Sequence, residues 1–160
     1  MTRKEKLDLV TKFGAAARAT QKEYGVPASI TVAQAILESS WGQSELAREG
    51  NNYFGIKARA GEEYCEFDTT EYVAGVAGRE RAKFRKFRSM QESFDGHARL
   101  LSCADRYQPA MAVKNDPLAF ALQLKLCGYA TDPKYPQKLT ALIHQYNLTS
   151  FDAAGEAATA

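Results

Sequence analysis

The spacing of apolar residues predicts that most of this chain is helical. Apolar side chains recur every three or four positions across residues 3–24, from Leu7 to Ala17, so this segment is expected to be an amphipathic helix that ends before Gly25. A short turn of helix is expected at residues 44–48. Three later segments show helical periodicity and are expected to be helices: residues 91–104, 117–127 and 135–146.

The pattern changes between about residues 63 and 88. Residues 69–73 and 81–85 are rich in strand-forming side chains, and Gly75 and Gly78 between them mark a turn. This pattern predicts a β-hairpin with a longish loop. The expected fold class is therefore α+β, with a mostly helical body and one small hairpin.

Residues 29–41 form the most apolar of the predicted helices. Its apolar positions go almost all the way round, which is typical of a buried, central helix, and Gly42 is well suited to end it. Trp41 lies three positions beyond Glu38 and is expected on a neighbouring face of the helix, where it either lines a groove or anchors the core.

Glu38 is the unusual residue of this helix. A buried carboxylate needs a partner or a function, and both the apolar surroundings and the negative end of the helix dipole would raise its pKa. A raised pKa suits a proton donor in catalysis, but an exposed rim position or a bond to a buried arginine would explain Glu38 as well. Glycoside hydrolysis usually requires a second carboxylate, and the hairpin segment offers six that spacing cannot rank: Glu62, Glu63, Glu66, Asp68, Glu71 and Glu80.

Length and composition narrow the class of protein. The 160 residues suffice for one domain, placed at residues 1–150, with a small, polar and flexible tail at 151–160. No apolar run approaches the ~20 residues that span a bilayer, and no secretory signal is seen. A net charge of +2 gives no reason to expect nucleic acid as a partner.

The cysteines and histidines indicate no metal site and no cofactor. Cys65, Cys103 and Cys127 lack the close pairing of zinc ligands, and neither His97 nor His144 has a metal-binding neighbour. The surroundings of Cys103 and Cys127 look helical and partly apolar, so free, buried thiols are the favoured interpretation, with a single disulfide as the alternative.

Several ordered segments resemble the family 73 glycoside hydrolases, the β-N-acetylglucosaminidases of autolysins, phage lysins and a flagellar hydrolase. The resemblance covers about residues 27–146. It is carried by AILESSWGQS (35–44), NNYFGIK (51–57), TTEY (69–72) with KFR (83–85), ESFDGHA (92–98) and GYATDPKY (128–135).

The resemblance implies a lysozyme-like fold, in which a helical lobe and a small β-hairpin lobe flank a substrate groove. Glu38 matches the family's general acid, Glu71 a second acid of the β-lobe, and Tyr129 an active-site tyrosine. The positions expected to contact the substrate are Trp41, Asn52, Phe54 and Tyr72.

The implied reaction is cleavage of the β-1,4 bond between N-acetylglucosamine and N-acetylmuramic acid in peptidoglycan. The protein would then act at the cell wall, as a monomer, without membrane insertion and by an export route that the sequence leaves open. The alternatives are a lytic transglycosylase or muramidase on the same fold, and a non-catalytic cell-wall-binding module.

Overall fold

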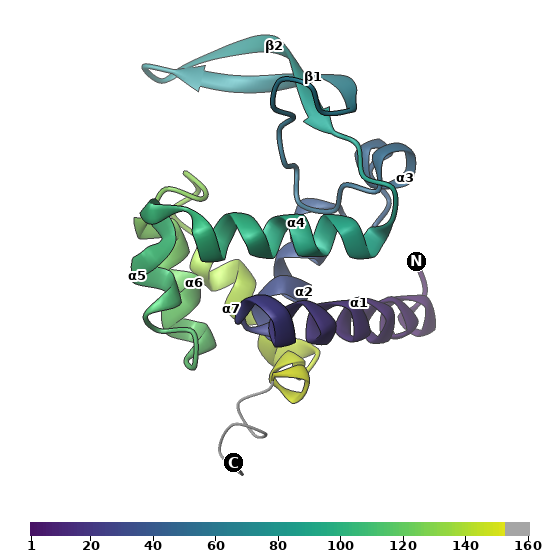
Figure 1. Ribbon diagram of the computed structural model, residues 1–160, viewed down its shortest axis with the longest axis vertical. Coiled ribbons are helices and arrows are strands. Elements are labelled where there is room, and N and C mark those ends of the chain that lie inside the picture. The colour runs from purple at the N-terminus through teal and green to yellow at the C-terminus, as the bar shows by residue number, and fades with distance from the viewer. Residues whose placement is uncertain (153–160) are drawn as a thin grey trace.

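The computed structural model describes residues 1–152, except for the side chains of residues 71–73. Helices make up most of the chain, and one hairpin projects from them (Figure 1). In chain order the elements are α1 (Arg3–Tyr24), α2 (Ala28–Glu38), α3 (Glu45–Gly50), β1 (Tyr64–Val73), β2 (Val76–Arg85), α4 (Met90–Cys103), η1 (Asp105–Tyr107), α5 (Gln108–Met111), α6 (Pro117–Leu126), α7 (Tyr135–Gln145) and η2 (Leu148–Phe151).

Helix α2 is the centre of the helical body, as its apolar sequence predicts. Every residue from 28 to 36 is buried, and the helix contacts α1, α6, α7 and η2. In Figure 1 it runs behind α1 and α4. A helix enclosed on all sides holds its last residues in a fixed position, so the core determines where Glu38 lies.

The prediction that this helix continues to Trp41 is wrong. It ends at Glu38, and Ser40, Trp41 and Gly42 then all adopt positive φ angles of 50°, 60° and 72°. Two consecutive non-glycine residues in the left-handed region are uncommon. The turn is held by Ser39, whose hydroxyl donates to the carbonyl of Ala35 and accepts from the Gly42 amide. Trp41 therefore does not share the helix with Glu38.

The hairpin has longer strands and a shorter turn than its composition predicts. β1 and β2 pair antiparallel in a register that runs from Tyr64 opposite Arg85 to Val73 opposite Val76. Only Ala74 and Gly75 connect the strands, both with positive φ, as in the tight turns that suit twisted hairpins. The predicted longish loop is wrong: its second glycine, Gly78, lies within β2.

The helices after the hairpin begin and end within one residue of their predicted bounds. The short elements η1, α5 and η2 were not predicted. Phe151 and Asp152, which the sequence places in the tail, pack on the core: the Phe151 ring covers Gly14, and the Asp152 carboxylate accepts hydrogen bonds from the Ser29 amide at 2.7 Å and hydroxyl at 2.8 Å. Asp152 thereby caps α2, which Pro27 cannot do. The rest of the predicted tail, residues 153–160, lies outside the described residues.

All three cysteines are free thiols, as the sequence favours. The predicted burial of Cys103 and Cys127 is wrong, because Cys103 is exposed and Cys127 is only partly covered. Among the described residues, no helix combines the length and apolar character needed to cross a membrane.

Candidate active site

Glu38 stands at the open end of the buried helix α2. Solvent reaches it, whereas the residues one and two turns earlier are buried. Its Oε1 atom accepts a hydrogen bond from the Tyr135 hydroxyl at 3.0 Å. The surrounding protein raises the pKa of the Glu38 carboxyl by desolvation, and the Tyr135 hydrogen bond offsets part of that rise. Glu38 is therefore both accessible and disposed to hold a proton.

Tyr135 links Glu38 to the core. It is the first residue of α7 and is 3% exposed. The Gln34 side chain, one turn before Glu38 on α2, donates to the Tyr135 hydroxyl at 2.9 Å, which leaves that hydroxyl's own proton for Glu38. Burial raises the pKa of Tyr135 far above its ordinary value, so the phenol stays protonated. Neither Tyr135 nor Gln34 was predicted as a site residue, although Tyr135 ends the GYATDPKY segment.

Tyr129 is brought to the same place by the end of α6. Gly128 adopts φ +85°, and the amides of Gly128 and Tyr129 donate back to the carbonyls of Lys125 and Leu124, which is the Schellman arrangement. The Tyr129 ring then stacks on that of Tyr135, with centroids 5.8 Å apart. Burial, and next the neighbouring Glu38 carboxylate, raise the pKa of Tyr129 well above normal. Glu38 and Tyr129, distant in sequence, thus lie in one cluster.

The loop of residues 51–57 supports this cluster from the hairpin side. Asn52 is 1% exposed and uses its whole side-chain amide on the backbone: Nδ2 donates to the carbonyls of Ile56 and Arg85, and Oδ1 accepts from the amides of Phe54 and Ile56. Phe54 is also buried and stacks on His97 at 4.0 Å. Both residues hold the loop in shape, and neither presents a free polar group to a groove.

His97 packs between Phe54 and Tyr129. It is fully buried, stacks on the Phe54 ring and forms a T-shaped pair with the Tyr129 ring. Neither of its ring nitrogens has a hydrogen-bond partner among the described residues. Burial lowers the pKa of His97 to about 3, so the imidazole is neutral at physiological pH. Its role is to pack against Tyr129. The sequence predicts no functional role for His97.

Trp41 is not part of the cluster. Its ring forms a T-shaped pair with that of Tyr146, with centroids 5.2 Å apart, and the Lys6 ammonium lies over the Trp41 ring, 5.0 Å from its centroid. Tyr146 caps the C-terminal end of α7, whereas Tyr135 begins that helix. The ring contact of Trp41 is therefore with the end of α7 opposite the tyrosine that contacts Glu38.

The second predicted acid, Glu71, has its backbone in β1 opposite Gly78, and Tyr72 lies opposite Ala77. Their side chains lie outside the described part of the chain. Three of the other hairpin acids are engaged in ion pairs: Glu66 and Asp68 with Arg81, and Glu62 with Arg85 at 3.2 Å. Within the described residues, no group of three or more acidic, histidine or cysteine side chains is placed to hold a metal ion.

The sequence matches known proteins over most of its length. Residues 14–148 match the family model described as Glucosaminidase: Mannosyl-glycoprotein endo-beta-N-acetylglucosaminidase. The chain is 41% identical over 136 residues to the exo-glucosaminidase LytG of Bacillus subtilis (strain 168), covering 82% of this chain and 48% of that protein. It is 38% identical over 149 residues to the peptidoglycan hydrolase FlgJ of Salmonella typhimurium (strain LT2), covering 89% and 47%. The chain thus spans about half the length of these relatives.

The fold also matches a solved structure. The catalytic domain of the autolysin Auto from Listeria monocytogenes superimposes with a TM-score of 0.83 at 31% identity, covering 95% of this chain and 90% of that one. The lysozyme-like arrangement of a helical lobe with a small hairpin lobe, expected from the sequence, is confirmed.

Proposed function

The chain belongs to the glucosaminidase family, and from this we propose that it is a peptidoglycan hydrolase with Glu38 as its general acid. The bond we assign is the β-1,4 bond that follows N-acetylglucosamine. Relatives named as a glucosaminidase and as a peptidoglycan hydrolase support the class of reaction. The observation that carries the role of Glu38 is its raised pKa at the open end of α2.

Tyr135 explains how Glu38 would release its proton. The phenol occupies Oε1, so we assign the transferable proton to Oε2. Desolvation raises the pKa of the carboxyl and so favours the protonated form, from which the glycosidic oxygen accepts the proton. The carboxylate that then forms is stabilised by the Tyr135 hydrogen bond, which is held in place by Gln34. That hydrogen bond strengthens as charge develops, so it lowers the barrier rather than only binding substrate.

Glu71 is our candidate for the group across the scissile bond. It would activate a water molecule or stabilise the oxocarbenium-like transition state. In a third route the substrate's own N-acetyl group attacks, assisted by Glu71 and Tyr129. Tyr129 suits either contact, because its phenol stays protonated and lies near the Glu38 carboxylate.

The residues predicted to contact the substrate would act in different ways, some directly and some by supporting a loop. Asn52 and Phe54 would act through the loop that they hold in shape, since both are buried. Tyr72 stays a prediction of direct contact from the hairpin. Trp41 would act only at the far end of α7, where its ring lies. We further propose that the protein works as a monomer on glycan strands at the cell wall.

Digestion of purified sacculi tests the proposal. Mass spectrometry of the soluble products should find reducing N-acetylglucosamine ends. Reducing N-acetylmuramic acid would indicate a muramidase, anhydro-muramyl ends a lytic transglycosylase, and binding without release a non-catalytic module; each of these results contradicts the proposed bond cleavage. The size distribution of early products separates endo cleavage, which we expect, from release of terminal sugars.

A further inference from the structure

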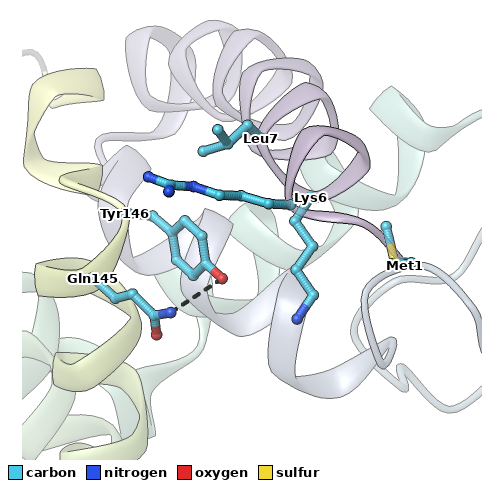
Figure 2. Close-up of a pocket in the computed structure, with 6 residues that line it drawn as sticks. Met1, Lys6, Leu7, Gln145 and Tyr146 are labelled. Carbon is cyan, nitrogen blue, oxygen red and sulfur yellow. Dashed lines mark hydrogen bonds between the residues drawn. The ribbon is translucent and has the colours of Figure 1, made fainter.

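A pocket lies at the opposite end of α7 from Tyr135. It encloses about 340 Å³ between the first two turns of α1 and the last residues around α7. Figure 2 shows the Tyr146 ring as one wall, with Lys6 and Leu7 reaching in from α1 and Gln145 beside the ring. Its volume is within the range of sites that bind small molecules. Its lining residues are Met1, Arg3, Lys6, Leu7, Gln145 and Tyr146.

The charge of this pocket favours an anion. Two of the six lining residues, Arg3 and Lys6, are cationic, and none is acidic. The positive N-terminal end of α1 and the negative C-terminal end of α7 meet here, and their partial charges of about half a unit each cancel. The two side-chain charges therefore remain. Gln145 donates to the Tyr146 hydroxyl at 3.3 Å, which fixes further polar groups beside them.

The remaining surface of the pocket is apolar and aromatic. Leu7 and Met1 are 44% and 52% exposed, and the Tyr146 ring stands next to them. An aromatic ring and exposed methyl groups suit the carbon faces of a sugar or the side chains of a short peptide. Cations beside such a surface recognise a carboxylate attached to an apolar or saccharide body.

We propose that this pocket is an anchoring subsite for a stem-peptide carboxylate of peptidoglycan. The naming of the polymer rests on the proposed function, whereas the preference for a carboxylate on an apolar body rests on the pocket alone. The pocket lies at the opposite end of α7 from Tyr135 and includes no residue of the Glu38 cluster, so it holds a part of the polymer that is not being cleaved. It would thereby fix the strand relative to Glu38.

Trp41 provides a built-in reporter of occupancy. It is the single tryptophan of the chain, and the Lys6 ammonium that lines the pocket also lies 5.0 Å above its ring. A carboxylate that draws Lys6 away from the ring changes the environment of the indole. Binding at the pocket is therefore expected to change Trp41 fluorescence.

The test is a fluorescence titration of the Glu38→Gln protein, which does not consume the ligand. A soluble disaccharide that carries its stem peptide should bind with a change in Trp41 emission, and a chitotetraose, which has no carboxylate, should give no such change. Isothermal titration calorimetry measures the affinities of the variants, because Lys6→Gln removes the ammonium on which the Trp41 signal depends. Adding Arg3→Gln and Lys6→Gln should weaken binding of the muropeptide about fourfold, since two exposed charge contacts are each worth a factor of about two. The matched control is Lys4→Gln with Lys12→Gln, which removes the same charge from α1 outside the pocket.

Three results would overturn the proposal. The first is equal muropeptide affinity in the pocket variant and its control. The second is equal affinity for a muropeptide whose stem-peptide carboxylates are amidated. The third is equally tight binding of a disaccharide that keeps only its lactyl carboxylate. Failure of the proposed function is distinguishable, because release of reducing ends is measured separately on the wild-type protein.

Discussion

The helical body and the hairpin position their acidic residues in different ways. The body places Glu38 at the end of a helix whose preceding residues are buried on every side, and fixes its carboxyl through Tyr135. The hairpin places Glu71 in a two-stranded sheet whose second strand is exposed from Val76 to Arg81. An isolated pair of strands is marginally stable in water, so the hairpin depends on its attachment to the body.

That attachment is concentrated at the base of the hairpin. Asn52 bonds the carbonyl of Arg85, Lys57 forms a bridge opposite Phe84, and Glu62 pairs with Arg85 at 3.2 Å. The geometry of Glu38, the proposed proton donor, is thus set by the core, whereas the position of Glu71, the proposed second acid, is set by a few contacts at the base of the hairpin. The two halves of the proposed reaction should respond differently to mutation.

Replacing Glu38 should give the largest loss of activity. Glu38→Gln keeps the shape and the hydrogen bond from Tyr135 but removes the transferable proton, so release of reducing ends should fall ~10²–10⁴-fold. The melting temperature should not fall, because the substitution removes a carboxyl that its surroundings already desolvate. Near-normal turnover in this variant would refute Glu38 as the general acid.

Replacing Glu71 tests whether the hairpin supplies the second catalytic group. We expect Glu71→Gln to lower the rate by about 10²-fold, the lower part of the range for a positioned acid or base. Glu80→Gln on the exposed strand β2 is the matched control and should leave the rate unchanged. If both variants kept full activity, the second role would pass to the substrate's N-acetyl group or to another acid. Azide rescue of Glu71→Ala, which vacates the space of the carboxylate, would support a direct role at the reacting centre.

The sequence predicts the body better than the hairpin and the site. Helix α1 has its predicted bounds because amphipathic spacing and Gly25 are local signals. The predicted end of α2 is wrong because the Ser39 hydroxyl closes a turn that contains Trp41, although the apolar pattern would continue the helix through it. Tyr135 could not be assigned a role, since its contact with Glu38 joins residues 97 positions apart.

Weakening the hairpin base should affect the two regions unequally. Asn52→Ala removes two donor and two acceptor contacts to buried backbone, and we expect it to cost about 2 kcal/mol in local opening. Amide exchange should quicken about thirtyfold in β1 and β2 and little in α2. Asp152→Ala is the contrasting variant: it removes the cap of α2 and should destabilise the body by about 1 kcal/mol without faster exchange in the hairpin. Uniform exchange changes in both variants would show that body and hairpin open together.

The smallest expected effect separates positioning from proton transfer. Tyr135→Phe removes the hydrogen bond that holds the pKa of Glu38 down, so that pKa should rise further above its ordinary value. A general acid works below its pKa, and the high-pH limb of the kcat/KM profile should therefore move to higher pH. The maximal rate should fall about tenfold, because the carboxylate formed in the transition state loses a charge-assisted hydrogen bond.

Tyr53→Phe is the control for this last substitution, because it removes the same hydroxyl group away from Glu38. Tyr53 packs against Phe13 and Phe94. Its profile should coincide with that of the wild-type protein. A rate loss in Tyr135→Phe without a shift of the limb would mean that Tyr135 only supports packing at the start of α7. A shift toward lower pH would mean that the phenol stabilises the protonated rather than the ionised form of Glu38, and the proposed direction of its hydrogen bond would then be wrong.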